Sequence, residues 1–204
     1  NALELAIDTT SENEDNIVKI NLSTAKDSIQ NKNIIYDKYG QNHFDIVSAF
    51  IKSIRGSDPD ATLYWLANMI EGGEDPDYIF RRLLISASED IGLADPNAIV
   101  VVNSCYGAFE KVGYPEGYYF LSQASLFLAN CPKSNSTKCI FNAIETVKLN
   151  RLSLVPDHLK YKSKTYKNPH NHKKNDLFQK YMPNNLIDHK IWHPSNSGWE
   201  YDKS

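Results

Sequence analysis

The sequence predicts an all-α protein, an antiparallel array of short helices followed by an extended aromatic segment. Two repeated signals support this fold class. The dipeptide Asp-Pro places a capping carboxylate before a proline that suits the first turn of a helix, and it occurs at Asp58-Pro59, Asp75-Pro76 and Asp95-Pro96. Glycines stand where a helix end needs a left-handed residue, at Gly56, Gly72-Gly73, Gly92 and Gly113. Predicted starts and stops therefore agree along the middle of the chain.

These signals divide the middle of the chain into six helices, expected at 43–55, 59–71, 76–91, 96–112, 115–130 and 135–149. The turns between them are short, and short turns make neighbouring helices pack antiparallel, as in a bundle. Upstream, residues 17–20 alternate like a short strand, and residues 23–30 are expected to form a helix capped by Ser23. The chain starts at Asn1-Ala2 without an initiator methionine, and we expect it to be a fragment of a longer protein.

The helices around residues 98–109 and 118–128 are apolar nearly all round. Such a helix is enclosed either by its neighbours or by another subunit. A domain of about six helices is too small to bury two of its helices on all sides. The pattern therefore favours a homo-oligomer over a purely monomeric core. The candidate interface consists of apolar and aromatic residues of these two helices, namely Val101, Val102, Tyr106, Phe109, Tyr118, Tyr119, Phe120 and Leu126.

Charge is divided unevenly along the chain: residues 1–150 carry a net charge of −8, and residues 151–204 carry +5. The second part mixes prolines with many aromatic residues, which is typical of an extended segment that packs on the helical domain rather than of disorder. A short helix is expected at 175–181. The lysines are candidate DNA contacts, with Tyr161 and Tyr166 as stacking faces, and they are Lys160, Lys162, Lys164, Lys167, Lys173 and Lys174. The alternative is that these tyrosines anchor the segment to the bundle.

Groups that could perform chemistry are sparse. The sequence contains no glycine-rich phosphate loop of either common type. Glu89-Asp90 lies close to Arg81-Arg82 and is interpreted as an acid–base pair in a cleft or, preferentially, as a set of salt bridges. The histidines of the C-terminal part are too irregularly spaced for a metal site, and they are His170, His172, His189 and His193. We therefore expect no catalytic, cofactor or metal site in this chain.

Three cysteines, at Cys105, Cys131 and Cys139, lack the spacing of zinc or redox sites and are expected to be buried free thiols in a reducing compartment. Burial in an apolar helix would raise the pKa of Cys105, which argues against a nucleophile at Ser104-Cys105. No stretch is apolar for the length that a membrane helix requires. These features favour a cytoplasmic protein that does not insert into membranes.

Several motifs resemble the C-terminal region of the replication-associated recombination protein A family of AAA+ ATPases, which is related to clamp loaders and to the Werner-helicase-interacting ATPase. The resemblance covers nearly the whole chain. It is carried by Tyr36-Asp37-Lys38, His43-Phe44-Asp45, the run 52–61, Leu63-Tyr64-Trp65-Leu66-Ala67, Gly73-Glu74-Asp75-Pro76, Arg81-Arg82-Leu83, the run 87–96, Val112-Gly113, Pro115-Glu116-Gly117, the run 132–136, Val155-Pro156 and His158-Leu159.

The resemblance implies a division into three parts. Residues 1–35 would be the end of the AAA+ lid subdomain, residues 36–150 a clamp-loader-collar-like helical domain that assembles subunits into a tetramer, and residues 151–204 the basic, aromatic C-terminal segment. The parent enzyme would bind ATP and Mg²⁺ through motifs upstream of this chain. It would act on DNA at stalled replication forks together with replication proteins. A DNA-binding module using the basic segment is the alternative function.

Overall fold

The computed structural model describes residues 41–171 and 179–203. The strand expected at 17–20 and the helix expected at 23–30 lie outside these ranges, as does most of the helix expected at 175–181. The described residues are helical and contain no strand, which confirms the predicted all-α class.

Six α-helices follow one another closely where the sequence predicted them. They are α3 (Gln41–Arg55), α4 (Pro59–Glu71), α5 (Pro76–Ser86), α6 (Ala98–Val112), α7 (Tyr118–Asn130) and α8 (Cys139–Leu149). The predicted helix 76–91 is a composite, because α5 continues as a π-helical turn at Ala87–Ile91 and a 3₁₀ turn at Gly92–Ala94. Further 3₁₀ turns lie at Ser136–Lys138, Asp157–Leu159, Pro169–Asn171, Asn184–Leu186 and Gly198–Lys203.

Two of the three predicted aspartate caps begin helices. The Asp58 carboxylate accepts a hydrogen bond from the Ala61 amide at 2.9 Å, at the start of α4, and Asp75 accepts one from the Asp77 amide at 3.0 Å, at the start of α5. Asp95 makes the same local bond to the Asn97 amide, but α6 begins only at Ala98. The third dipeptide therefore forms a turn before the helix.

The helix ends show a similar mixture of agreement and correction. Gly73 after α4 has φ = 77°, and the Glu74 amide donates back to the Met69 carbonyl, as expected for a left-handed terminating glycine. After α3 the left-handed residue is Ser57, with φ = 57°, and not the predicted Gly56. The Asp58 amide closes this end by donating to Ser53.

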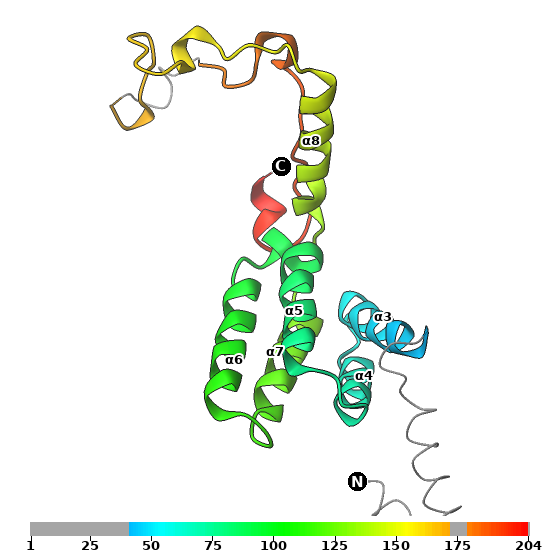
Figure 1. The fold of residues 1–204 in the computed structure, drawn as a ribbon. Coiled ribbons are helices and arrows are strands. Elements are labelled where there is room, and N and C mark those ends of the chain that lie inside the picture. Colours follow the sequence, from blue (N-terminus) through cyan, green and yellow to red (C-terminus); the bar gives the residue numbers. More distant parts are fainter. Residues whose placement is uncertain (1–40, 172–178, 204) are drawn as a thin grey trace, which may run out of the picture.

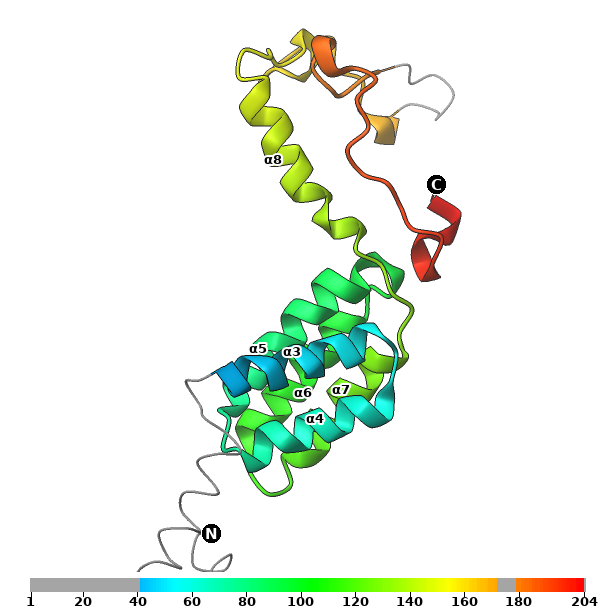
Figure 2. The same ribbon diagram turned by 90° about the vertical axis from the view of Figure 1, so that its right-hand side faces the viewer.

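Five helices, α3 to α7, form a bundle in which α7 contacts all four of the others. Figures 1 and 2 show α5, α6 and α7 side by side, with α3 and α4 covering one side of them. The core is continuous, and its largest fully buried side chains include Phe50, Phe80, Met69, Leu83 and Leu121. The amphipathic and apolar stripes of the sequence therefore close into one hydrophobic core.

The rest of the chain forms an arm. Helix α8 rises from one end of the bundle, the chain turns over at its far end, and the C-terminal residues come back to the base of α8 (Figures 1 and 2). There the 3₁₀ turn Gly198–Lys203 packs on Gly92–Ala94. Gly198 is required at this contact, because its φ is 56° and a Cβ atom would lie 2.0 Å from the Ala94 carbonyl oxygen.

Candidate self-association surface

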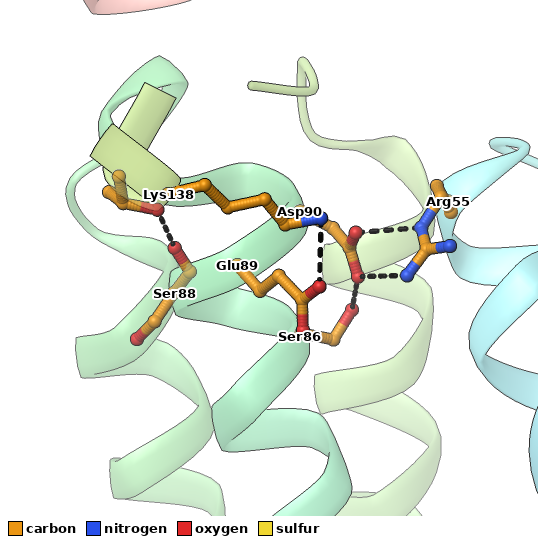
Figure 3. A network of polar contacts seen from close by, with 7 residues as sticks. Arg55, Ser86, Ser88, Glu89, Asp90 and Lys138 are labelled. Carbon is orange, nitrogen blue, oxygen red and sulfur yellow. Dashed lines mark hydrogen bonds and ion pairs between the residues drawn. The ribbon is translucent and has the colours of Figure 1, made fainter. Parts of the chain in front are cut away.

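A polar network holds the end of α3 to the π-helical turn that follows α5 (Figure 3). The buried carboxylate of Asp90 accepts hydrogen bonds from Arg55 Nε at 2.7 Å and from Ser86 Oγ at 3.0 Å. These bonds form because the π-turn directs Asp90 toward the neighbouring helix, where its charge is matched. Asp90 is thus a satisfied structural anion.

The same turn is bonded to the linker that leads into α8. The Glu89 carboxylate pairs with Lys138 Nζ at 3.0 Å, and Thr137 Oγ1 donates to the Ser88 carbonyl at 2.8 Å (Figure 3). The Ser134 amide donates to the carbonyl of Asp90. The salt-bridge interpretation of Glu89-Asp90 is therefore confirmed, although the partners are Arg55 and Lys138 and come from distant elements.

A second buried carboxylate, Glu200, holds the returning C-terminal turn to this linker. It accepts hydrogen bonds from Ser134 Oγ at 3.1 Å, from Ser136 Oγ and from the Ser195 amide. Burial alone would raise the pKa of Glu200, but the hydrogen bonds from Ser136, Ser195 and Ser134 outweigh it and leave the pKa below its ordinary value. The base of the arm is therefore held at two places, where the linker enters α8 and where the C-terminal turn returns.

Above this base, α8 is largely exposed, and the returning chain meets it where His189 contacts Thr146. The helix has no buried side chain, although six of its 11 residues are aliphatic or aromatic. Phe141 and Val147 are each 68% exposed, and Ile140 and Ile144 are also exposed. The apolar surface continues into the turn beyond the helix, where Leu149, Leu152, Leu154 and Val155 are exposed. We call residues 149–155 the arm tip.

An apolar groove of about 700 Å³ lies at the opposite end of α8, where the helix meets α5 and α6. Its apolar walls are Leu84, Ile85, Ile99, Ile140 and Phe141. Ser88, Glu89, Thr137 and Lys138 complete its lining. We call this hollow the junction groove. A second hollow of about 820 Å³ lies at the arm tip, between residues 148–157, Lys160, Asn184 and Asn185.

The predicted interface residues of α6 and α7 divide into three groups. Val102 and Phe109 are buried in the core of the chain itself, where the Phe109 ring packs against Phe80 and Tyr114. Tyr118 and Tyr119 are exposed, and Tyr119 is 76% exposed. The other four are half-buried, and they are Val101, Tyr106, Phe120 and Leu126. Neither helix is wholly enclosed, but the larger apolar surface is on α8, which the prediction did not include.

Four of the six candidate DNA-contacting lysines belong to the described residues, whereas Lys173 and Lys174 lie outside them. Lys160, Lys162, Lys164 and Lys167 are all exposed in the extended part of the arm. Lys160 forms an ion pair with Asp157, and Lys162 Nζ lies 5.2 Å from the centre of the exposed Tyr161 ring. Tyr161 and Tyr166 are both exposed, so they do not anchor the segment to the bundle.

The remaining candidates are the histidines and the cysteines. In the parts of the chain that the structure describes, no group of histidines, cysteines and acids gathers as a metal site would require; His172 lies outside those parts. Cys105 and Cys131 are buried free thiols, and Cys139 is half-buried. Burial raises the pKa of Cys105, and burial together with Asp95 raises that of Cys131 to about 11. None of the described helices is long and apolar enough to span a membrane.

Comparison with known proteins identifies the family of this chain. A sequence profile described as "MgsA AAA+ ATPase C terminal" matches residues 56–204, and one described as "AAA C-terminal domain" matches residues 1–55. The chain belongs to the MgsA C-terminal family of AAA+ ATPases. This confirms the resemblance seen in the motifs, and the boundary between the two matches falls at the end of α3.

Three curated relatives show the extent of the similarity. "Replication-associated recombination protein A" of Bacillus subtilis is 41% identical over 97% of this chain and 49% of its own length. The protein of the same name from Escherichia coli is 46% identical over 53% of this chain and 24% of its own length. "ATPase WRNIP1" of Dictyostelium discoideum is 46% identical over 53% of this chain and 12% of its own length. The chain spans about half the length of the Bacillus subtilis relative.

Proposed function

We propose that this chain is the self-association module of a cytoplasmic AAA+ ATPase of replication-associated recombination, with a homotetramer as the expected assembly. ATP and Mg²⁺ are expected to bind to other parts of the whole protein, which would act on DNA with replication proteins. The relatives' names support the process, and the family supports the kind of enzyme. The observation that carries the assembly role is that α8 has no buried residue.

The physical argument starts from the length and composition of α8. A helix of 11 residues is marginal in water by itself, because helices shorter than about 12–15 residues gain too little from their own hydrogen bonds. Exposed apolar patches of this extent mark interaction surfaces in soluble proteins. Since α8 projects from the bundle and meets it only at its first turn, beside α5 and α6 (Figure 1), a second copy is the cover that the chain always has available.

The test is the molar mass of the purified chain by light scattering or sedimentation. We expect a multimer at tens of micromolar, and we expect Phe141→Glu with Val147→Glu to reduce it to a monomer, because each charge would have to be buried at the contact. Tyr64→Glu, at an exposed tyrosine of α4, is the matched control and should leave the mass unchanged. A wild-type chain that is strictly monomeric would refute the proposal.

Tyr119→Glu tests whether the exposed surface of α7 takes part in assembly in addition to that of α8. If α7 contributes to assembly, as the sequence analysis expects, this substitution also lowers the molar mass. If only α8 does so, the Tyr119 variant keeps the mass of the wild-type chain. Either result locates the contact on one helix or on both.

DNA binding by the arm is a second candidate, favoured by the exposed rings and ammonium groups at Tyr161, Lys162 and Lys164. We expect Lys162→Ala, Lys164→Ala and Lys167→Ala together to weaken binding to single-stranded DNA. The slope of log K against log salt should fall by about 0.7 for each lost phosphate contact. Lys52→Ala with Lys111→Ala, exposed on the bundle, is the control. Binding that is absent, or unaffected by salt, would remove this candidate.

A further inference from the structure

The two apolar surfaces differ in how far their side chains are exposed. The junction groove is a hollow between α5, α6 and the first turn of α8, whereas at the arm tip, which has a hollow of its own, Leu152 is exposed by 92% and Leu154 by 81%. An exposed pair of leucines and an apolar hollow of about 700 Å³ are complementary. Neither surface is covered within the described chain.

They also differ in charge. Lys148 and Arg151 flank the arm tip, where Lys160 is paired with Asp157, and the part of the chain from residue 151 onward carries a net charge of +5. Residues 1–150, which include the bundle, carry −8. Opposite charges favour contact between an arm and a bundle, whereas two arm tips in contact would bring like charges together.

The chain cannot join its own two surfaces. They lie at opposite ends of α8, whose 11 residues hold them roughly 16 Å apart as a rigid rod. The base of the rod is fixed to the bundle by the Glu89–Lys138 pair and by the bonds of Glu200. Docking of the tip in a groove therefore requires a second molecule.

We propose that copies of this chain assemble head to tail, with the arm tip of one copy seated in the junction groove of the next. Leu152 and Leu154 enter the hollow walled by Ile85, Ile99 and Phe141, and the basic residues of the tip lie over the acidic bundle of the neighbour. This inference rests on the proposed self-association. Because each copy donates one tip and receives another, the contact is heterologous, and repeating it builds a ring if the rotation between copies closes and an open filament if it does not.

Two variants, each damaged on one surface, test this arrangement. The groove variant carries Ile85→Glu and Ile99→Glu, and the tip variant carries Leu152→Glu and Leu154→Glu. All four side chains are exposed, so each variant should keep the helical circular dichroism of the parent chain. We expect each variant alone to be monomeric, since every contact then meets a damaged surface.

Mixing the two variants is the decisive step. The intact tip of the groove variant can enter the intact groove of the tip variant, but the remaining two surfaces are both damaged. The mixture should therefore form a one-to-one dimer by light scattering and nothing larger. Phe44→Glu, at an exposed residue of α3, serves as the control and should retain the mass of the wild-type assembly.

The other outcomes are distinguishable. A mixture that stays monomeric, or a variant that alone keeps the wild-type mass, shows that tip and groove do not meet and overturns the head-to-tail contact. In either case the proposed self-association stands, provided that the wild-type chain is a multimer. A monomeric wild-type chain overturns both proposals.

Discussion

Helices α7 and α8 have similar lengths, 13 and 11 residues, and both are rich in apolar side chains, yet they have opposite environments. Helix α7 contacts α3, α4, α5 and α6 and buries Leu121, Ala124, Ser125, Leu128 and Ala129. Helix α8 buries none of its residues. The comparison teaches that an apolar helix is covered only where the chain path gives it neighbours. In this protein the path leaves the bundle after Cys131.

The largest expected effect is the difference in unfolding free energy between truncating a phenylalanine of the bundle and truncating one of the arm. Phe80 is fully buried, and its ring packs against Tyr106 and Phe109. Phe80→Ala should lower the free energy of unfolding by about 3–5 kcal/mol, because it leaves a cavity in the core. Phe141→Ala, at low protein concentration, should change it by no more than about 0.5 kcal/mol. Urea unfolding of both variants measures the difference, and equal losses would contradict the comparison.

A smaller effect concerns the two neighbouring carboxylates of the π-helical turn. Asp90→Ala leaves Ser86 without its acceptor and removes the partner of Arg55, and it should cost about 1–3 kcal/mol, toward the lower end because Arg55 is half-exposed. Glu89→Ala removes a surface pair with Lys138 and should cost less than about 1 kcal/mol. Urea unfolding is again the measurement. A larger loss for Glu89 than for Asp90 would reverse our assignment of the structural anion.

A further effect of about this size sharpens the description of the base of the arm. Since the pKa of Glu200 is lower in the folded chain than its ordinary value of 4.5, its contribution is present above that value and is lost as the pH falls through the folded pKa. Glu200→Gln should cost about 1 kcal/mol at neutral pH.

Hydrogen exchange of the amides of residues 195–203 reports on this contact. We expect protection in the parent chain to fall below about pH 4.5 as the carboxylate is protonated. The Gln variant should start with roughly fivefold less protection, equivalent to about 1 kcal/mol, and should lack this acid dependence. An identical pH profile in both chains would show that Glu200 does not hold the C-terminal turn.

Local signals in the sequence predicted where the helices lie, but they did not predict which residues the helices contact. Asp58 and Asp75 cap helices as predicted, because a cap depends on residues within one turn of it. The left-handed residue after α3 is Ser57 and not Gly56, since the closing bond from Asp58 to Ser53 determines which residue must turn. The partners of Asp90 and Glu89 were missed because Arg55 and Lys138 lie 35 and 49 residues away.

By itself, the sequence determined that this chain is helical, where most of its helices begin and end, and to which family it belongs, because capping, periodicity and motifs are properties of short stretches. Only the tertiary structure decided that α7 packs into the core while α8 stays largely exposed, and that the apolar surface of the arm lies at 140–155. Burial depends on which elements meet in space. That depends on the path of the whole chain, which in this protein is set by contacts such as Ser134 to Glu200.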